Sequence, residues 1–173
     1  MRGDEAAFDA LIERVGDHLH SVARRILRDP YLAEDATQRA LLDAWRNLPR
    51  LRDPDRFDAW AHRLIVNACL AEARRERRHR GNLRLVASDE PVVLDSTSRI
   101  ATQHMLDQAF RQLGVEHRAV VVLIHYVGLS AVEAAEVMGT PVGTVRSRLH
   151  YALQSMRAAV EAEARLETNV ETA

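Results

Sequence analysis

Apolar residues recur at intervals of three and four along almost the whole chain, the spacing that places them on one face of an α-helix. In the first segment, for example, Phe8, Val15, Leu19 and Ile26 form such a stripe. No stretch alternates between apolar and polar residues as a half-buried strand does. Because Ala, Leu, Arg and Glu, which favour helix, also dominate the composition, the sequence predicts an all-α protein.

Prolines and glycines divide this pattern into separate helices. Asp29-Pro30 ends the first helix and Pro49 ends the second. Proline has no backbone N–H to continue a helix, and it disfavours helical backbone at the residue before it. Asp53 and Pro54 suit the N-cap and the first position of the third. The expected helices cover about residues 4–27, 32–47, 54–80, 98–113, 116–127 and 130–138, and a last one runs from 141 past 156.

The helical pattern is interrupted once, over residues 81–97. This stretch holds Pro91, several Ser, Thr and Asp residues, and no apolar stripe. We interpret it as a linker between two small helical domains, residues 1–80 and 98–160. A short acidic tail, residues 161–173, has no functional interpretation.

Composition excludes several classes of protein. The chain is 47% hydrophobic and 28% charged, which favours a packed core over disorder. Its 24 basic residues are all Arg and face 25 acidic ones, so the overall charge lacks the basic footprint of an autonomous DNA-binding domain. The single cysteine, Cys69, rules out an internal disulfide and a Cys-rich zinc site, and we interpret it as buried rather than redox-active.

The sequence also predicts a cytoplasmic protein with no membrane insertion. Its first residues are charged and contain no apolar signal core. The longest apolar run, residues 119–124, is far shorter than the ~20 residues that cross a bilayer.

Residues 129–157 predict two short helices joined by a tight turn. Ser130 and Glu133 have the spacing of a capping box, and Gly139 suits the left-handed residue that ends a helix. Thr140-Pro141 then opens the next helix as N-cap and first-position proline. This arrangement predicts a helix-turn-helix, whose second helix meets base edges in the major groove. The alternative is a helical hairpin with a solvated Arg face, since caps and a glycine turn serve any hairpin.

The string from Gly128 to Ala152 favours DNA binding. It closely resembles region 4 of extracytoplasmic-function (ECF) sigma factors, whose hallmark is a stretch like GLSxxEIAxxxGxPxGTVRSRLxRA. The resemblance implies a domain that binds the −35 promoter element, with Arg146 suited to guanine and Arg148 to a phosphate. Tyr151 stands where the family often has Arg. The residues assigned to the −35 element are Thr144, Arg146, Ser147, Arg148, His150 and Tyr151.

The segment LAEDATQRALLDAWRNL, residues 32–48, resembles region 2.2 of the same family, typically AEDLVQEVFLRAWRAL. In the family this helix packs on the clamp helices of the β′ subunit of RNA polymerase. Arg39 replaces a usual acidic residue, which would weaken or retune that contact. For Trp45 alone we favour core packing over a direct contact. The resemblance assigns to core polymerase the residues Asp35, Gln38, Arg39 and Trp45.

The segment FDAWAHRLIVNACLAEARRERRHR, residues 57–80, resembles regions 2.3 and 2.4, usually FxxWLxRIAxNxxxDxxRR. Promoter opening requires a surface that captures a displaced base and cations that hold the backbone. The arginines within residues 74–80 have an alternative interpretation, a solvated helix end that complements the helix dipole. Phe57 and Trp60 lie on the apolar stripe, and we interpret them as core. The residues assigned to the −10 element are Asn67, Arg74, Arg75, Arg77 and Arg78.

Together the two matches imply an ECF sigma factor. Such a protein binds the β′ clamp helices and the β flap of core RNA polymerase, recognises promoter DNA, and performs no chemistry. An anti-sigma factor is expected by resemblance only, and no cofactor or metal is expected.

Two other classes of protein were weighed. An ordinary helix-turn-helix regulator would bind duplex DNA alone as a dimer, and the region 2 match argues against it. An enzyme or metal protein is suggested only by the 8 histidines, which complete no triad or ligand set in the sequence.

Overall fold

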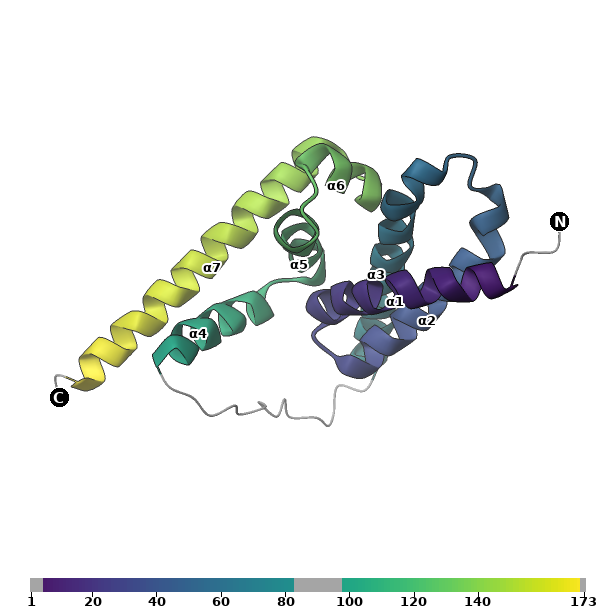
Figure 1. Ribbon diagram of the computed structural model, residues 1–173. Coiled ribbons are helices and arrows are strands. Elements are labelled where there is room, and N and C mark those ends of the chain that lie inside the picture. Colours follow the sequence, from purple (N-terminus) through teal and green to yellow (C-terminus); the bar gives the residue numbers. More distant parts are fainter. Residues whose placement is uncertain (1–4, 83–97, 172–173) are drawn as a thin grey trace.

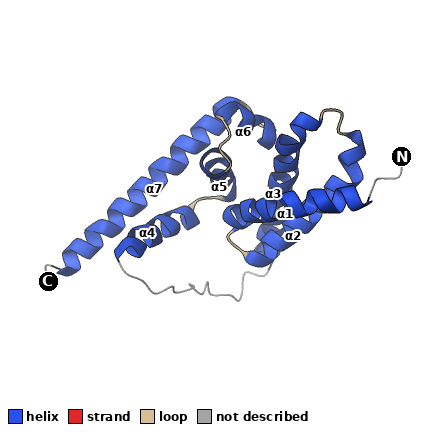
Figure 2. Ribbon diagram, viewed as in Figure 1, coloured by secondary structure: helices blue, strands red, loops and turns tan. Residues whose placement is uncertain are grey.

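The computed structural model describes the backbone of residues 5–82 and 98–171, and within them the side chains of residues 11–79 and 105–162. Every regular element in these residues is helical and none is a strand (Figure 2). This confirms the predicted all-α class. Most of the predicted linker, and the tail side chains from residue 163 onward, lie outside the described residues.

The N-terminal half consists of three helices that all pack on one another (Figure 1). Asp29 starts the second of them, because its carboxylate accepts hydrogen bonds from the backbone nitrogens of Tyr31 and Leu32 at 2.9 and 3.0 Å. The elements are α1 (Glu5–Leu27), α2 (Pro30–Asn47), the 3-10 turns η1 (Leu48–Arg50) and η2 (Pro54–Arg56), and α3 (Phe57–Asn82).

The start of α3 differs slightly from the prediction. Asp53 does act as a cap, accepting a hydrogen bond from the Asp55 nitrogen at 3.1 Å. The turn that follows is 3-10, however, so the α-helix begins at Phe57 and not at Pro54.

The C-terminal half contains two long helices that lie side by side, α4 and α7, and shorter helices between them in sequence (Figure 1). Ala109 and Leu113 of α4 pack against Ala152 and Met156 of α7 in a small apolar cluster. The elements are α4 (Ser98–Gln112), α5 (Val115–Val121), the π-helical turn η3 (Val122–Tyr126), α6 (Ala131–Met138) and α7 (Val142–Glu171).

The helix predicted over residues 116–127 is interrupted after Val121. The chain widens into the π-helical turn η3, in which the nitrogen of Val127 donates to the carbonyl of Val122 at 3.0 Å. A π-turn adds one residue to a helical turn and has no signature in apolar spacing, so the sequence did not indicate it.

The two halves share one hydrophobic core. Its fully buried members include Val22 of α1, Ile65 of α3, Val120 of α5, Ala134 of α6 and Val145 of α7. In Figure 1, α6 lies next to α3 and α5 next to α1, and both pairs are in contact. The halves therefore pack against each other instead of standing apart.

Polar contacts between the halves gather at the end of α1. Arg28 follows the helix with a φ of 63°, a left-handed conformation that residues other than glycine adopt rarely. Its guanidinium pairs with Asp107 of α4 at 2.5 Å. Arg118 of α5 donates through Nε to the carbonyl of Ile26 at 2.6 Å, which satisfies an acceptor at the end of α1.

Candidate nucleic-acid interface

The helix-turn-helix has the local geometry that its sequence predicts, with one exception. Ser130 and Glu133 form a complete capping box, and Gly139 ends α6 with a left-handed φ of 61°. Thr140 is not the N-cap of α7, because its buried hydroxyl makes no hydrogen bond within the described residues. The carbonyl of Pro141 instead accepts from the nitrogens of Thr144 and Val145, at 2.9 and 3.3 Å.

The first turns of α7 present one polar face outward. Val145 and Ala152 are fully buried against the rest of the domain, so this helix has a fixed inner side. The predicted −35 residues on its outer side are Arg146, Ser147, His150 and Tyr151, all exposed, with Thr144 half-buried beside them. An exposed N-terminal face of a second helix is the part that reads the major groove in this motif.

Arg148 differs from the other predicted −35 residues, because it has a partner inside the protein. Its guanidinium pairs with Glu116 of α5, and its side chain is 23% exposed. The ring of Tyr151 contacts that of His117, also on α5, at 5.3 Å between centroids. Glu116 and His117 therefore brace the start of α7. Sequence reasoning missed both, since nothing local links positions so far apart.

The predicted −10 residues lie along the exposed side of α3. Asn67, Arg74, Arg77 and Arg78 are exposed, and so is Arg75. Arg75 approaches the buried carboxylate of Glu72 at 3.7 Å. The other three arginines leave a concentration of positive charge toward the end of the helix.

A further cationic group lies at the other end of α3, in the turn that leads to it. Arg50, Arg52 and Arg56 line a hollow of about 700 Å³ together with Trp60. Trp60 and Asn67 are seven residues apart, so they share one face of the helix. Trp60 is half-buried and does not belong to the shared core, so its interpretation as core was wrong, while Phe57 does pack against that core.

This hollow combines an aromatic ring with three guanidinium groups, one of which, that of Arg56, pairs with the carboxylate of Asp53 at 3.8 Å. That combination suits single-stranded nucleic acid, whose bases stack on rings and whose phosphates pair with cations. Sequence reasoning missed these three arginines, and the signal that could have found them is their density in the short stretch LPRLRDPDR, residues 48–56.

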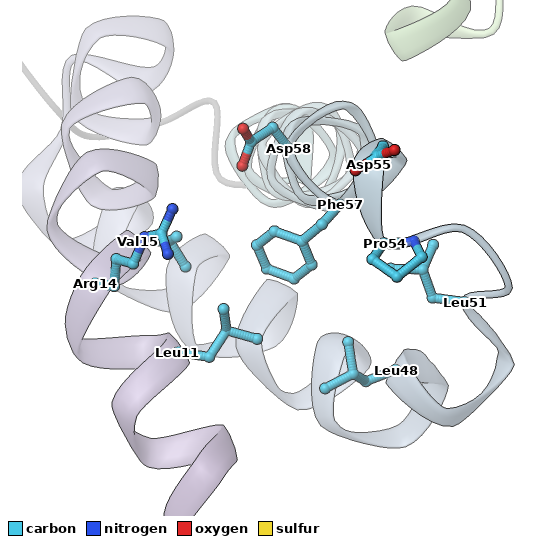
Figure 3. Close-up of a pocket in the computed structure, with 9 residues that line it drawn as sticks. All are labelled: Leu11, Arg14, Val15, Leu48, Leu51, Pro54, Asp55, Phe57 and Asp58. Atoms are coloured by element: carbon cyan, nitrogen blue, oxygen red, sulfur yellow. The ribbon is translucent and has the colours of Figure 1, made fainter.

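A second hollow, of about 560 Å³, opens on the other side of the same turn. In Figure 3 the ring of Phe57 points into the space between Leu11 of α1 and Leu48 of η1. Asp55 and Asp58 also line it (Figure 3). Arg14 lines it as well, but the two carboxylates outnumber this one cation, so the hollow is a poorer site for a nucleic-acid backbone than the first.

The outer face of α2 carries an apolar stripe. Tyr31 is 80% exposed, Leu42 55% and Trp45 42%, so core packing of Trp45 was the wrong interpretation. Asp35 and Gln38 are exposed on the same face. These five residues follow one another at intervals of four and three, the repeat by which a helix packs along a coiled coil. Tyr31 and Leu42 were missed by sequence reasoning, although this spacing could have indicated them.

Arg39 belongs to a different side of α2. Its guanidinium forms an ion pair with Glu72 of α3, a carboxylate that is only 2% exposed. The structure thus gives Arg39 a partner within the N-terminal half.

Cys69 is fully buried on α3, as predicted. Burial raises the pKa of its thiol to about 12, and the charge of Glu72 adds to the effect. A thiol in this state is a poor nucleophile.

No helix in the parts of the chain that the structure describes is long and apolar enough to cross a membrane. Comparison with protein families gives matches to both halves. The model described as "Sigma-70 region 2" matches residues 11–79, and that described as "Sigma-70, region 4" matches residues 103–156.

Curated relatives are similar over most of their length. The ECF RNA polymerase sigma factor SigM of Mycobacterium tuberculosis is 37% identical over 148 residues, which are 86% of this chain and 74% of that protein. The ECF RNA polymerase sigma factor SigL of the same organism is 33% identical over 165 residues, covering 91% and 93% of the two chains.

Solved structures share the fold. CnrH, in complex with the cytosolic domain of CnrY, is 30% identical with a TM-score of 0.62, covering 92% of this chain and 91% of that one. RpoE of Bartonella quintana, in complex with the anti-sigma factor NepR, has a TM-score of 0.68 at 21% identity, covering 90% and 97%. The latter likeness shows the fold alone.

Proposed function

Because the chain belongs to the ECF group of the sigma-70 family of RNA polymerase sigma factors, we propose that it binds core RNA polymerase and directs it to promoters with particular −10 and −35 elements. It is not an enzyme, and its output is the choice of a transcription start site. Region 2 corresponds to residues 1–80, the linker to 81–97 and region 4 to 98–160. The cytoplasm is its site of action, since its template is there.

The exposed stripe on α2 is the observation that carries this proposal. Tyr31, Leu42 and Trp45 are exposed apolar side chains on this face, with the polar Asp35 and Gln38 between them, and exposed apolar groups rimmed by polar ones mark interaction sites. The spacing of four and three suits a partner made of paired helices, which describes the β′ clamp.

The N-terminal half then opens the −10 region. Trp60 offers a stacking surface next to the cations of Arg50 and Arg52, and Asn67 lies two turns further along the same face. Stacking on the ring offsets the loss of base stacking in the duplex, by about 1–3 kcal/mol per base. Arg74, Arg77 and Arg78 hold phosphates beyond it.

The C-terminal half grips the −35 element as duplex. Arg146 reads a base edge from the exposed start of α7, and Ser147, His150 and Tyr151 lie beside it. Arg148, braced by Glu116, holds the helix in place and reaches a phosphate only if that pair opens.

An anti-sigma factor is the expected regulator. The complex of CnrH with the cytosolic domain of CnrY shows that a similar chain binds a protein partner. By the same reasoning this chain binds one, whose identity its own residues do not specify.

The test is co-elution of the purified chain with core RNA polymerase. The Trp45→Ala variant and the Asp35→Ala/Gln38→Ala double variant should weaken the complex at least tenfold, while Gln154→Ala, an exposed change on α7, should not alter it. A regulator of the ordinary kind would give the opposite pattern, with no complex and tight binding of duplex DNA by the chain alone.

A further inference from the structure

Two histidines from different helices meet where the two halves of the protein touch. His18 of α1 and His62 of α3 bring their Nε2 atoms to 3.1 Å. Their rings meet edge to face, with centroids 5.3 Å apart. At this distance one nitrogen donates a proton and the other accepts it. The arrangement therefore suits two neutral rings, or one charged and one neutral ring since His18 is exposed, and it excludes two charged ones.

The pair is linked to the C-terminal half through Tyr126 of η3. The ring of His18 stacks on that of Tyr126 at 5.9 Å, with only 14° between their planes. The guanidinium of Arg25, two turns further along α1, lies 3.8 Å from the centre of the same tyrosine ring. Tyr126 of the π-turn thus contacts two residues of α1, His18 and Arg25.

The surroundings of the pair oppose a second positive charge. His62 is 8% exposed, and burial lowers its pKa below the usual value, as does the charge of His18. The carbonyl and the carboxylate of Asp58, one turn earlier on α3, act in the opposite direction but do not outweigh these effects. The Nδ1 atom of His62 is buried and makes no hydrogen bond of good geometry.

The remaining charged groups nearby do not favour protonation. From α1, Arg25 places a positive charge next to Tyr126. No charged side chain of α5 or α6 forms a hydrogen bond or ion pair with either histidine among the described residues.

We propose that His18, His62 and Tyr126 form a proton-sensitive latch between the two halves of the chain. With both histidines neutral, His18 holds its ring on Tyr126 and the halves stay together. A second proton on the pair drives His18 away from His62, removes the stack on Tyr126 and shifts the chain toward a form in which the halves separate. The latch is a property of the free chain and does not depend on the proposed function.

The size of the effect follows from proton linkage. In the closed form the pKa of His62 lies below its ordinary value of 6.5, and in the open form it returns to that value. The open form therefore binds a proton more readily, and the equilibrium shifts toward it as the pH falls below 6.5. Between pH 7.5 and pH 5.5 the open-to-closed ratio should rise by up to about tenfold. Above pH 7.5 the latch makes its full contribution to the stability of the closed form, and that contribution is lost as the pH falls.

The ion pair of Asp107 with Arg28 is another polar contact between the halves, and it serves as a reference for the effect of pH. Burial raises the pKa of Asp107, but the hydrogen bonds and charges of Arg28 and Arg111 outweigh burial and leave it below its ordinary value. The ion pair of Asp107 with Arg28 therefore stays intact from pH 7.5 to pH 5.5. A change over this range cannot come from that pair.

The experiment measures the distance between the halves by single-molecule fluorescence transfer in the full chain. Dyes are attached to Ala59→Cys on α3 and Arg157→Cys on α7, which are both exposed, while the native Cys69 is buried and unreactive. The separated population should grow by up to tenfold between pH 7.5 and pH 5.5. His18→Phe keeps a ring on Tyr126 and removes the charge of His18 but not the burial of His62, so the separated population of this variant should grow less between the two pH values than that of the wild type.

Tyr126→Leu serves as the second variant, and it should enlarge the separated population at pH 7.5 by up to about tenfold and weaken the response of that population to pH. The proposal is overturned if the wild-type distances do not change with pH, or if His18→Phe responds like the wild type. It is equally overturned if helical circular dichroism falls in step with the distance change, because acid unfolding would then explain the result.

Discussion

Arg39 of α2 forms an ion pair with Glu72 of α3, and Glu72 is almost completely buried. Arg39 stands at a position where the family pattern usually has an acidic residue. The pair joins the helix proposed to bind polymerase to the helix proposed to bind the −10 strand. It stabilises the relative position of these two surfaces.

Removing Arg39 should destabilise the chain, because the buried carboxylate of Glu72 loses its main partner. A fully buried pair would cost about 3–5 kcal/mol, but Arg39 is 45% exposed and Arg75 is near Glu72, so we expect about 1–2 kcal/mol for Arg39→Ala. Urea unfolding measures the change. Arg46→Ala is the control, since its pair with Asp43 is exposed and 4.0 Å long, and equal losses for the two variants would contradict the role given to Glu72.

Gly139 and Gly143 should respond in opposite ways to replacement by alanine. Gly139 has a φ of 61°, which an alanine adopts only at a cost of about 1–2 kcal/mol. Gly143 is helical and has open space around its α-carbon, so alanine there should be neutral or stabilising by up to about 1 kcal/mol. Thermal unfolding distinguishes them, and a stable Gly139→Ala variant would show that the turn is built differently.

Cys69 should be chemically silent in the folded protein. With a pKa of about 12, the thiol is almost entirely protonated at pH 7.5, and it is also fully buried. Labelling by a thiol reagent should therefore be at least 100-fold slower than for the unfolded chain, and urea should restore the ordinary rate. Fast labelling of the native protein would revive a redox role for this residue.

Replacing Arg146 and replacing Arg148 by alanine should impair promoter binding for different reasons. Arg146→Ala should lower transcription from a −35-dependent promoter by an amount equivalent to about 1–3 kcal/mol of DNA binding, with the melting temperature unchanged. Arg148→Ala should lower the melting temperature as well, because it breaks the pair with Glu116 that braces α7. If Arg148→Ala left stability intact and only weakened promoter binding, the original assignment of this residue to phosphate would be the better one.

Much of this fold was accessible from the sequence, for physical reasons that differ between elements. Caps and glycine turns are local, so Ser130, Glu133 and Gly139 identified α6 directly. The −35 residues came from the resemblance to region 4, and the structure leaves Arg146, Ser147, His150 and Tyr151 exposed at the start of α7.

What sequence reasoning could not reach depends on contacts between distant segments. The π-turn that carries Tyr126 leaves apolar spacing unchanged, and the pairs of Arg148 with Glu116 and of Arg39 with Glu72 join different helices. The two tryptophans were misjudged for a related reason. Each lies close to an apolar stripe, and only the packing of neighbouring helices decides that Trp45 is left exposed.

The central claim is that this chain selects promoters for RNA polymerase, and transcription reconstituted on genomic DNA tests it most directly. Core polymerase from the source organism is incubated with fragmented genomic DNA, with and without the chain, and the 5′ ends of the transcripts are sequenced. The account predicts a small set of new start sites that share −10 and −35 motifs and disappear with Arg146→Ala. Start sites unchanged by the chain, despite a folded protein, would contradict it.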